Sequence, residues 1–256
     1  MENILRTDCI SQRFGGVKAL TDISLSIPKG RIFSIIGPNG AGKTTFFNAI
    51  SGLAAPVAGK VFFEEEEITG LKSFQIQQRG ISRTFQNIRL FPEMSVKENV
   101  IVGDHSRSTK SIFNSVLRTK TYKETEKQME AEAERWMSFF GLYHLRHQNP
   151  TSLPYGLQRK LEIARAMVSD PTLLLLDEPA AGMNEAETIE LRNDILKLSE
   201  LGTTILLIEH DMKFVMSLSD HIAVLNHGCL LKVGTPKEIL EDELVIDAYL
   251  GTEVDL

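Results

Sequence analysis

Residues 31–45 read RIFSIIGPNGAGKTT, and this stretch decides the fold. The apolar run 31–36 predicts a strand, residues 37–44 match the pattern GxxxxGK[ST], and Lys43–Ser51 is predicted to be a helix. Glycine in such a loop lets the backbone wrap closely around phosphate oxygens and present its N–H donors. The helix that follows points its positive end at the same anion. This order of strand, loop and helix therefore predicts a phosphate-binding loop.

The loop itself supplies the residues that we expect to hold a nucleotide. Lys43 can reach the β- and γ-phosphates, and the hydroxyl of Thr44 can bind Mg²⁺. The nucleotide-binding residues predicted in the loop are Gly37, Pro38, Asn39, Gly40, Ala41, Gly42, Lys43, Thr44 and Thr45.

Strand and helix patterns alternate outside the loop. Apolar runs predict strands at Leu173–Leu176, Thr204–Ile208 and His221–Leu225, and helical patterns cover Leu157–Val168 and Glu185–Leu201. The first two runs lack polar alternation, which is typical of strands buried on both faces of a parallel sheet. The alternation predicts an α/β fold.

Two segments follow other patterns. Lys60–Ile68 predicts a strand and a hairpin turn, with the run Glu64–Glu67 at a solvated tip. Residues 88–168 predict a mostly helical insertion, and His105–Lys123 within it is locally basic. We interpret that basic segment as a solvated helix, with contact to lipid or to a partner as the alternative. An amphipathic stripe in the insertion is expected to pack on neighbouring helices, and its members are Met129, Ala133, Trp136, Met137 and Phe140.

The composition limits the function classes. The 256 residues carry a formal charge of -6, which argues against a general nucleic-acid binder because neutralising phosphates requires a basic surface. Cys9 and Cys229 are far apart, so neither a disulfide framework nor a zinc site is indicated. No apolar run reaches the roughly 18 residues of a membrane span, and Met1–Phe14 lacks the apolar stretch of a signal peptide. We expect a cytoplasmic chain that meets a membrane only through a partner.

Two adjacent carboxylates follow the run of four leucines, in the stretch LLLLDEP at 173–179. Asp177 stands at the carboxyl end of the predicted strand, where open α/β sheets bind ligands, and can hold Mg²⁺ directly or through water. Glu178 can act as the general base on an attacking water. Together with the phosphate-binding loop, this pair predicts nucleotide hydrolysis.

The motifs in this order resemble the ATP-binding cassette (ABC) ATPases of membrane transporters. The resemblance implies that Gln86, in RTFQN at 83–87, is the Q-loop glutamine that senses Mg²⁺ and the water and faces the membrane subunit. It also implies that His210 is the switch histidine that contacts the γ-phosphate, and that the D-loop lies at 180–184. Phe14 stands where the family stacks an aromatic ring on adenine, although a core position is the alternative. The implied catalytic residues are Glu178, His210, Lys43 and Gln86, and the implied metal ligands are Thr44, Gln86 and Asp177.

The segment LPYGL at 153–157 resembles the signature motif, which is usually Leu-Ser-Gly-Gly-Gln. The resemblance implies that Leu153, Pro154, Tyr155 and Gly156 contact the ATP that is held by an opposite subunit. Because Pro154 lacks the serine hydroxyl, the contact must depend on backbone N–H groups and on the start of the next helix. Asn184 replaces the usual D-loop aspartate, which removes a charge and keeps a hydrogen-bond acceptor.

The resemblance implies a P-loop NTPase (RecA-like) core with an antiparallel β subdomain and an inserted helical subdomain. It implies a single ABC ATPase domain over 1–256, with the core at 1–87 and 169–256 and the helical subdomain at about 88–168. ATP and Mg²⁺ are the implied cofactors.

A more specific resemblance is to the ATPases of branched-chain amino-acid importers, and within them to LivG-type subunits. It is carried by LPYG, LEIAR at 161–165 and RTFQNIRLF at 83–91. The implied partners are membrane permease subunits, a second ATPase (LivF-type or a second copy), and indirectly a substrate-binding protein, at the cytoplasmic face of the membrane. The alternatives are an ATPase for urea, other amino acids or lipopolysaccharide, a non-transport ABC ATPase, a small-molecule P-loop kinase, or a regulatory module without turnover.

Overall fold

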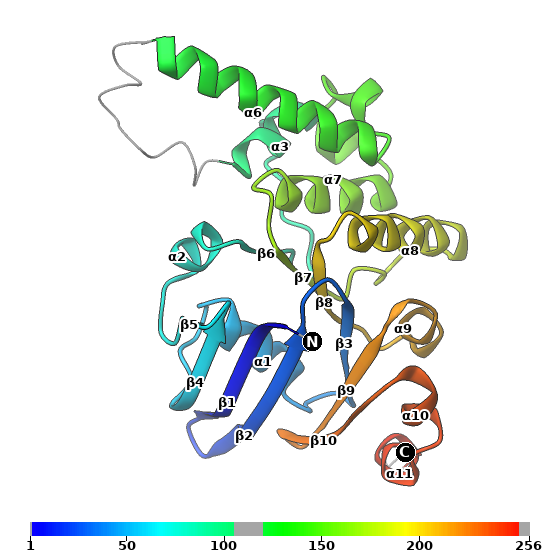
Figure 1. Ribbon diagram of the computed structural model, residues 1–256. Helices are drawn as coiled ribbons and strands as arrows, with labels where there is room; N and C mark the ends of the chain where they lie inside the picture. The colour runs from blue at the N-terminus through cyan, green and yellow to red at the C-terminus, as the bar shows by residue number, and fades with distance from the viewer. Residues whose placement is uncertain (1, 105–119, 251–256) are drawn as a thin grey trace.

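The computed structural model describes residues 2–104 and 120–250, and two sheets form its centre (Figure 1). The larger sheet has six strands in the order β10-β9-β3-β8-β7-β6. Neighbouring strands pair in parallel from β9 to β6, and β10 pairs antiparallel to β9 at one edge. The predicted α/β class is confirmed. The strands are β3 (Ile32–Ile36), β6 (Ile81–Arg83), β7 (Leu173–Asp177), β8 (Thr204–Ile208), β9 (His221–Asn226) and β10 (Cys229–Gly234).

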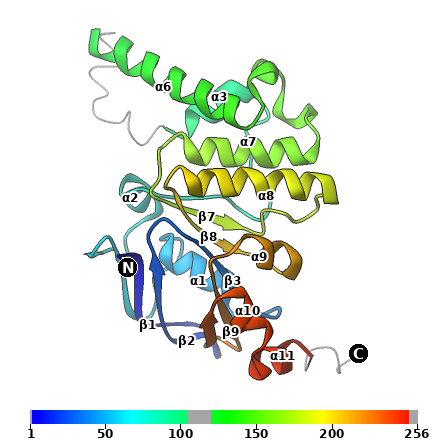
Figure 2. The same ribbon diagram turned by 45° about the vertical axis from the view of Figure 1, so that its right-hand side comes forward.

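The central strands are buried on both faces, which explains their continuous apolar runs. Leu174 and Leu176 of β7 pack in one core with α7 (Tyr155–Met167), α8 (Glu185–Glu200) and α9 (Met212–Leu218). Leu173 and Leu175 point the other way, into a second core with α1 (Lys43–Ile50) and the smaller sheet. Figure 2 shows α7 and α8 on one side of β7 and β8, with α1 on the other side.

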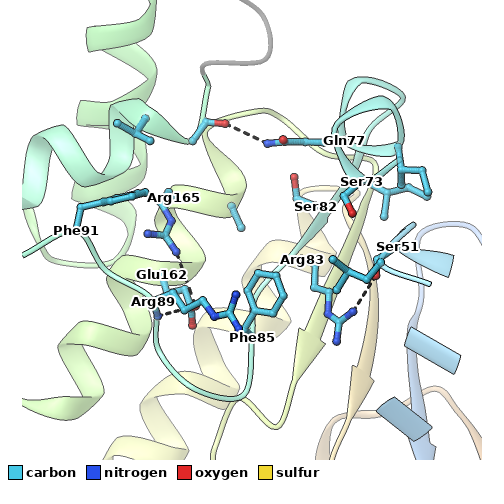
Figure 3. Close-up of a pocket in the computed structure, with 16 residues that line it drawn as sticks. Ser51, Ser73, Gln77, Ser82, Arg83, Phe85, Arg89, Phe91, Glu162 and Arg165 are labelled. Atoms are coloured by element: carbon cyan, nitrogen blue, oxygen red, sulfur yellow. Dashed lines mark hydrogen bonds and ion pairs between the residues drawn. The ribbon is translucent and has the colours of Figure 1, made fainter. Parts of the chain in front are cut away.

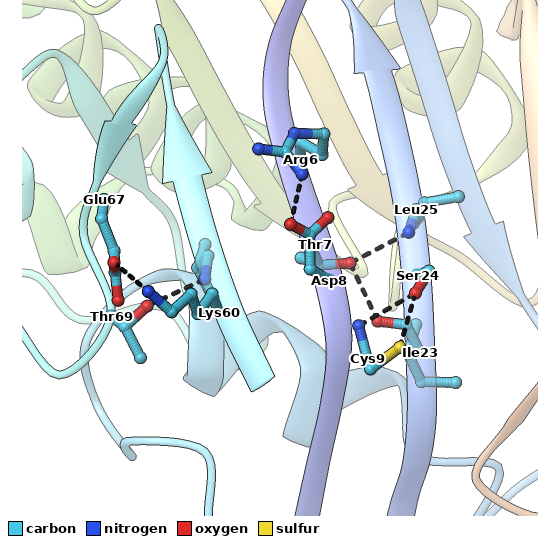
Figure 4. Close-up of polar contacts among 11 residues, drawn as sticks. Arg6, Thr7, Asp8, Cys9, Ile23, Ser24, Leu25, Lys60, Glu67 and Thr69 are labelled. Atoms are coloured by element: carbon cyan, nitrogen blue, oxygen red, sulfur yellow. Dashed lines mark hydrogen bonds and ion pairs between the residues drawn. The ribbon is translucent and has the colours of Figure 1, made fainter. Parts of the chain in front are cut away.

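The smaller sheet is antiparallel, in the order β2-β1-β4-β5. Its last hairpin turns at Glu64 and Glu65, whose φ angles of 46° and 66° suit a tight two-residue turn. The predicted strand and hairpin are confirmed, and Lys60 Nζ donates to Glu67 Oε2 at 2.8 Å across them (Figure 4). The strands are β1 (Asn3–Phe14), β2 (Val17–Pro28), β4 (Ala58–Phe63) and β5 (Glu66–Glu67).

Side chains stabilise an irregular stretch between β1 and β2. The register shifts between Thr7 and Ile10, so part of the backbone ladder is interrupted. The buried Thr7 hydroxyl donates to the carbonyl of Ile23 and accepts from the N–H of Leu25, at 3.1 and 3.0 Å (Figure 4). These bonds supply partners to β2 backbone groups beside the interrupted part of the ladder.

Helices form a layer beyond the larger sheet (Figure 1). Its members include α3 (Val96–Val102), α6 (Lys120–Phe139) and α7, which pack on one another. The predicted stripe lies on α6 and just past its end: Ala133, Trp136, Met137 and Phe140 are at most 3% exposed. The prediction that this stripe packs against neighbouring helices is therefore confirmed for these four residues, whereas its first member, Met129, is half-buried and lies outside the core cluster. The basic segment His105–Lys123 lies outside the residues whose side chains the structure describes.

The remaining helices are short. They are α2 (Ser73–Gln78), α10 (Pro236–Leu240) and α11 (Glu243–Leu250), with 3₁₀ turns at Tyr143–Leu145 and Pro150–Ser152. Over residues 2–104 and 120–250, no helix combines the length and the apolar character that a bilayer span requires.

Candidate active site

The predicted site residues meet at one edge of the larger sheet. Because β3, β8, β7 and β6 run parallel, their carboxyl ends lie at the same edge. The phosphate loop follows β3, Glu178 follows β7, His210 comes two residues after β8, and Gln86 comes three residues after β6. Four segments that are far apart in the sequence therefore converge on one site.

Two glycines of the phosphate loop stand where no side chain fits. Gly37 has φ +150°, and a Cβ there would lie 2.1 Å from the carbonyl oxygen of Leu225 in β9. Gly42 has φ +101°, and a Cβ there would lie 2.5 Å from the carbonyl oxygen of Ala19 in β2. Gly42 is also the N-cap of α1, so the loop leads directly into a helix with free N–H donors.

Lys43 is held by the carbonyls of its own loop. Its Nζ donates to the backbone oxygens of Gly37 at 2.6 Å and Pro38 at 3.0 Å. Burial lowers the pKa of this ammonium, while the nearby carboxylates of Glu178 and Asp177 oppose that effect. A buried cation that is bonded to neutral carbonyls can exchange them for a phosphate oxygen and so gain a charged partner.

The two carboxylates after β7 point in different directions. Asp177 is the last residue of the strand and is 4% exposed. Glu178 has φ +47°, a left-handed conformation, and its N–H donates to the carbonyl of Ile208 at 3.0 Å. This turn brings the Glu178 carboxylate toward the residues that follow the neighbouring strands, while Asp177 stays at the strand end.

The carboxylate of Glu178 joins the Q-loop glutamine and the histidine after β8. Gln86 Nε2 donates to Glu178 Oε2 at 2.7 Å, and His210 Nδ1 lies 3.9 Å from the same oxygen. The His210 side chain is 64% exposed and that of Glu178 is 21% exposed, so the group opens to solvent. The structure thus brings Gln86, Glu178 and His210 together, beside Lys43 and Asp177.

Sequence reasoning missed Glu209, which is buried next to this group at 1% exposure. Its Oε1 accepts from the N–H of Ala180 at 2.8 Å, and its Oε2 accepts from the N–H of His210 at 3.2 Å. Burial raises the pKa of the Glu209 carboxyl. The available signal was an acidic residue directly after the buried strand Thr204–Ile208, at the ligand-binding edge.

Two arginines were also missed, and both contact site residues. Arg83 ends β6 and its Nη2 lies 2.7 Å from Asp177 Oδ2. Arg159 of α7 is fully buried and donates to the carbonyls of Phe85 and Gln86, each at 2.8 Å. The sequence signal was the placement of Arg83 within RTFQN at 83–87 and of Arg159 near the start of the predicted helix Leu157–Val168, directly after LPYGL.

The signature residues lie against the D-loop and α8. The helix α7 begins at Tyr155, two residues before the predicted start at Leu157, because Pro154 serves as its N-cap and first-turn residues need no apolar periodicity. Gly156 therefore lies inside the first turn, where N–H groups lack helical partners. A Cβ on Gly156 would lie 2.8 Å from Glu187 Oε1, so this glycine also makes room for a side chain of its own subunit.

Asn184 caps α8. Its Oδ1 accepts from the N–H of Glu187 at 3.0 Å, while Glu187 Oε2 accepts from the N–H of Asn184 at 3.1 Å, which is a complete capping box. Asn184 replaces the usual D-loop aspartate and keeps its Oδ1 acceptor, and this acceptor is used in the cap. A Cβ added at Gly182 in the same loop would lie 3.3 Å from the ring of Tyr155, so signature and D-loop touch.

Phe14 ends β1 with 53% of its surface exposed. It pairs with Val17 across the β1–β2 turn, and β2 then passes beside the phosphate loop at Ala19. The exposure argues against a core role and leaves the ring face free for a planar ligand.

A cavity of about 400 Å³ lies between the end of β6 and the helical layer (Figure 3). Its walls include Arg89, whose guanidinium carbon lies 4.5 Å from the ring centre of Phe85, and Arg165, at 5.6 Å from that of Phe91. Glu162 is buried beneath them, and burial raises the pKa of its carboxyl. Phe85, the residue before Gln86, also lines this cavity.

The residues at the sheet edge fit a nucleotide with a divalent cation. The loop is open at Gly40, where a Cβ would meet nothing within 4 Å, and Lys43 offers a cation beside it. Mg²⁺ takes hard oxygen ligands, together with water and phosphate oxygens. The site offers such ligands in the hydroxyl of Thr44, the amide oxygen of Gln86 and the carboxylate of Asp177.

Comparison with protein families agrees with this geometry. Residues 20–181 match the family model described as ABC transporter, and residues 233–255 match one described as branched-chain amino acid ATP-binding cassette transporter. The high-affinity branched-chain amino acid transport ATP-binding protein BraF of Pseudomonas aeruginosa is 44% identical over 97% of this chain and 98% of the relative. The corresponding LivG protein of Escherichia coli (strain K12) is 43% identical with the same coverage.

A solved structure agrees as well. The ADP conformation of an ATP-binding cassette from an ABC transporter is 34% identical, covers 98% of this chain and 100% of that one, and superimposes with a TM-score of 0.86. Its likeness confirms the P-loop NTPase core that the resemblance implied. The chain therefore belongs to the ABC transporter family, as one of its ATP-binding and ATP-hydrolysing cassettes.

Proposed function

We propose that this chain is the ATP-hydrolysing subunit of an importer of branched-chain amino acids. The observation that carries the enzymatic part is the Glu178 carboxylate, which accepts a hydrogen bond from Gln86 and lies 3.9 Å from His210, beside Lys43 and its loop. The branched-chain part is supported by the family match at 233–255 and by relatives whose names state that transport.

ATP binds along the loop after β3. Residues 37–45 offer backbone N–H groups and the Lys43 ammonium to the phosphates, and Phe14 offers its exposed ring to adenine. Thr44, Asp177 and Gln86 would hold a Mg²⁺ ion, which would neutralise charge on the phosphate oxygens.

Hydrolysis depends on proton transfer and on charge. Glu178 accepts the proton of the attacking water, and Gln86 holds the carboxylate in place through its amide N–H. Lys43 and His210 offset the charge on the transferring phosphoryl group. Glu209 fixes the backbone of His210, so the imidazole starts from a defined position.

A second ATPase subunit completes the site. The N–H groups in the first turn of α7, next to Leu153, Pro154, Tyr155 and Gly156, lack helical partners and replace the missing serine hydroxyl as donors to the opposite γ-phosphate. The partner is a LivF-type subunit or a second copy of this chain.

The permease subunits dock over the cavity beside Gln86, where Phe91 is 44% exposed. Pro92 and Met94 extend this apolar surface. Docking places the chain peripherally at the cytoplasmic face of the membrane, and the permease links it to a substrate-binding protein. The chain is then a single ABC ATPase domain, with its core at 1–87 and 169–256 and its helical subdomain at about 88–168.

The test of the enzymatic part is Glu178→Gln, with Glu185→Gln as a matched control on the exposed first turn of α8. The Glu178 variant should keep ATP binding and lose roughly 10²- to 10⁴-fold in steady-state hydrolysis. Turnover within a few-fold of wild type in that variant, or an equal loss in the control, would contradict the role of Glu178.

The transport part is tested by uptake of labelled leucine into vesicles that carry the complete transporter. Phe91→Asp should reduce uptake and co-purification of the permease, and it should leave ATP binding to the isolated chain unchanged. Leu201→Asp, at another exposed apolar residue just after α8, is the control. Leucine uptake that does not depend on this chain would refute the branched-chain assignment.

A further inference from the structure

Arg83 is a buried cation that contacts the proposed metal carboxylate. Its Nη2 lies 2.7 Å from Asp177 Oδ2, and the two side chains are 7% and 6% exposed. The pair joins the ends of the neighbouring parallel strands β6 and β7. It therefore stands inside the sheet edge where the site residues converge.

The same guanidinium also reaches the helix that follows the phosphate loop. Arg83 Nη1 donates to Asn48 Oδ1 at 2.9 Å and to Ser51 Oγ at 2.8 Å, and the contact with Ser51 is visible in Figure 3. Phe47 and Phe85 lie on it, with ring centres 5.5 and 5.2 Å from the guanidinium carbon. One side chain thus links α1, the Q-loop segment and Asp177.

A buried ion pair is weak evidence for stability alone, because desolvation of both charges offsets their attraction. The geometry here gives a more specific effect. A planar guanidinium that is fixed by Asn48 on α1 and by Ser51 just after it presents its other nitrogen in a defined direction. Asp177 Oδ2 bonds to that nitrogen, so the rotation of the carboxylate is restricted and its second oxygen remains for another ligand.

We propose that Arg83 is a positioning residue that orients the Asp177 carboxylate for Mg²⁺ and fixes its distance from the phosphate loop. The proposal rests on the proposed role of Asp177 as a metal ligand. Groups that orient a metal ligand typically change metal affinity about 10- to 100-fold when they are removed.

The experiment measures ATP affinity of the full chain by calorimetry, with Mg²⁺ and with EDTA. Arg83→Met removes the polar contacts and keeps much of the apolar volume. We expect its affinity for metal-free ATP to stay within about two-fold of wild type, while the gain in affinity on adding Mg²⁺ falls about 10- to 100-fold. Arg79→Met is the control, because Arg79 lies four residues before Arg83 and pairs with Glu66 at the surface.

An equal loss of affinity with and without Mg²⁺ in Arg83→Met would show a merely structural role and overturn the proposal. An unchanged Mg²⁺ effect in the folded variant would also overturn it. If Arg83→Met does not fold, Arg83→Lys carries the test: it keeps the charge but cannot bridge α1 and Asp177, so the Mg²⁺ effect should fall by a smaller factor. An unchanged Mg²⁺ effect in that variant overturns the proposal.

The variant Asp177→Asn separates this proposal from the proposed function. If Asp177→Asn removes the Mg²⁺ effect and the Arg83 variants do not, only the positioning role fails. If Asp177→Asn leaves the Mg²⁺ effect intact, the metal site itself is wrong.

Discussion

Two different groups could require a glycine at position 156, one in the same chain and one in the proposed dimer. Adding a single methyl group there tests which of the two does. In the same chain, a Cβ would lie 2.8 Å from Glu187 Oε1, while in the proposed dimer it would hold the opposite phosphate off the N–H groups of α7. Gly156→Ala adds this methyl group alone. An aspartate would be a poorer test, because its carboxylate would also lie beside that of Glu187.

The effect on folding should be small. Alanine in a helix is favoured over glycine by about 0.8–1 kcal/mol. The clash meets the end of a flexible side chain, and moving Glu187 loses its bond to the N–H of Asn184, which is worth about 1 kcal/mol. These effects offset each other, so urea unfolding should change by less than about 1 kcal/mol. Formation of the ATP-dependent dimer should instead lose a hydrogen bond to a charged group, which is worth about 1.5–3 kcal/mol. The association constant of that dimer should therefore fall roughly 10- to 100-fold.

The assay is light scattering with ATP in a Glu178→Gln background, with the second ATPase subunit present. The Gly156→Ala variant should fold and bind ATP normally. It should need a higher concentration of the second ATPase subunit to form the ATP-dependent dimer. The double variant Gly156→Ala/Glu187→Ala should show the same defect, since the phosphate contact remains blocked. If Glu187→Ala restores closure, the glycine serves packing within the chain and the reasoning about the phosphate is refuted.

Three further predictions concern residues whose environment the structure describes. Lys43→Ala should greatly weaken ATP binding and abolish turnover, because the loop loses its ammonium; near-normal affinity by calorimetry would contradict this. Phe14→Ala should weaken ATP binding by about 1–3 kcal/mol with little change in unfolding, since the ring is 53% exposed, and Phe14→Tyr should be tolerated; destabilisation without a binding defect would place Phe14 in the core. The pKa of Glu209 is raised in the folded chain, so the protonated carboxyl favours folding. This contribution to the free energy of unfolding is complete below the pKa that Glu209 has in the unfolded chain. It is lost as pH rises through the pKa that Glu209 has in the folded chain. Glu209→Gln should therefore reduce the fall in unfolding free energy between about pH 4.5 and neutrality, and an unchanged slope in urea titrations would count against burial as the cause.

Most site residues could be predicted because each belongs to a local pattern. A strand, a glycine-rich loop and a helix follow one another over residues 31–51, and Asp177 and Glu178 directly follow a leucine run. Their meeting needs one further rule, that parallel strands end at the same edge.

The partners of the buried charges could not be predicted in this way. Arg83 meets Asp177 only because β6 pairs with β7, and β6 is three residues long, too short to show a period. The start of α7 was placed two residues late for a related reason: Pro154 and Gly156 disfavour a helix interior but suit a first turn.

The contacts of Gln86 indicate how binding at the cavity can reach Glu178, the proposed catalytic base. Its carbonyl accepts from Arg159, which is anchored in α7, and its side-chain amide donates to Glu178. The neighbouring carbonyl of Phe85 is held by the same arginine, so the backbone of this segment cannot shift independently of α7. A permease that moves the helical layer would therefore move the amide that holds Glu178. Coupling between transport and hydrolysis then requires no contact between the permease and the nucleotide.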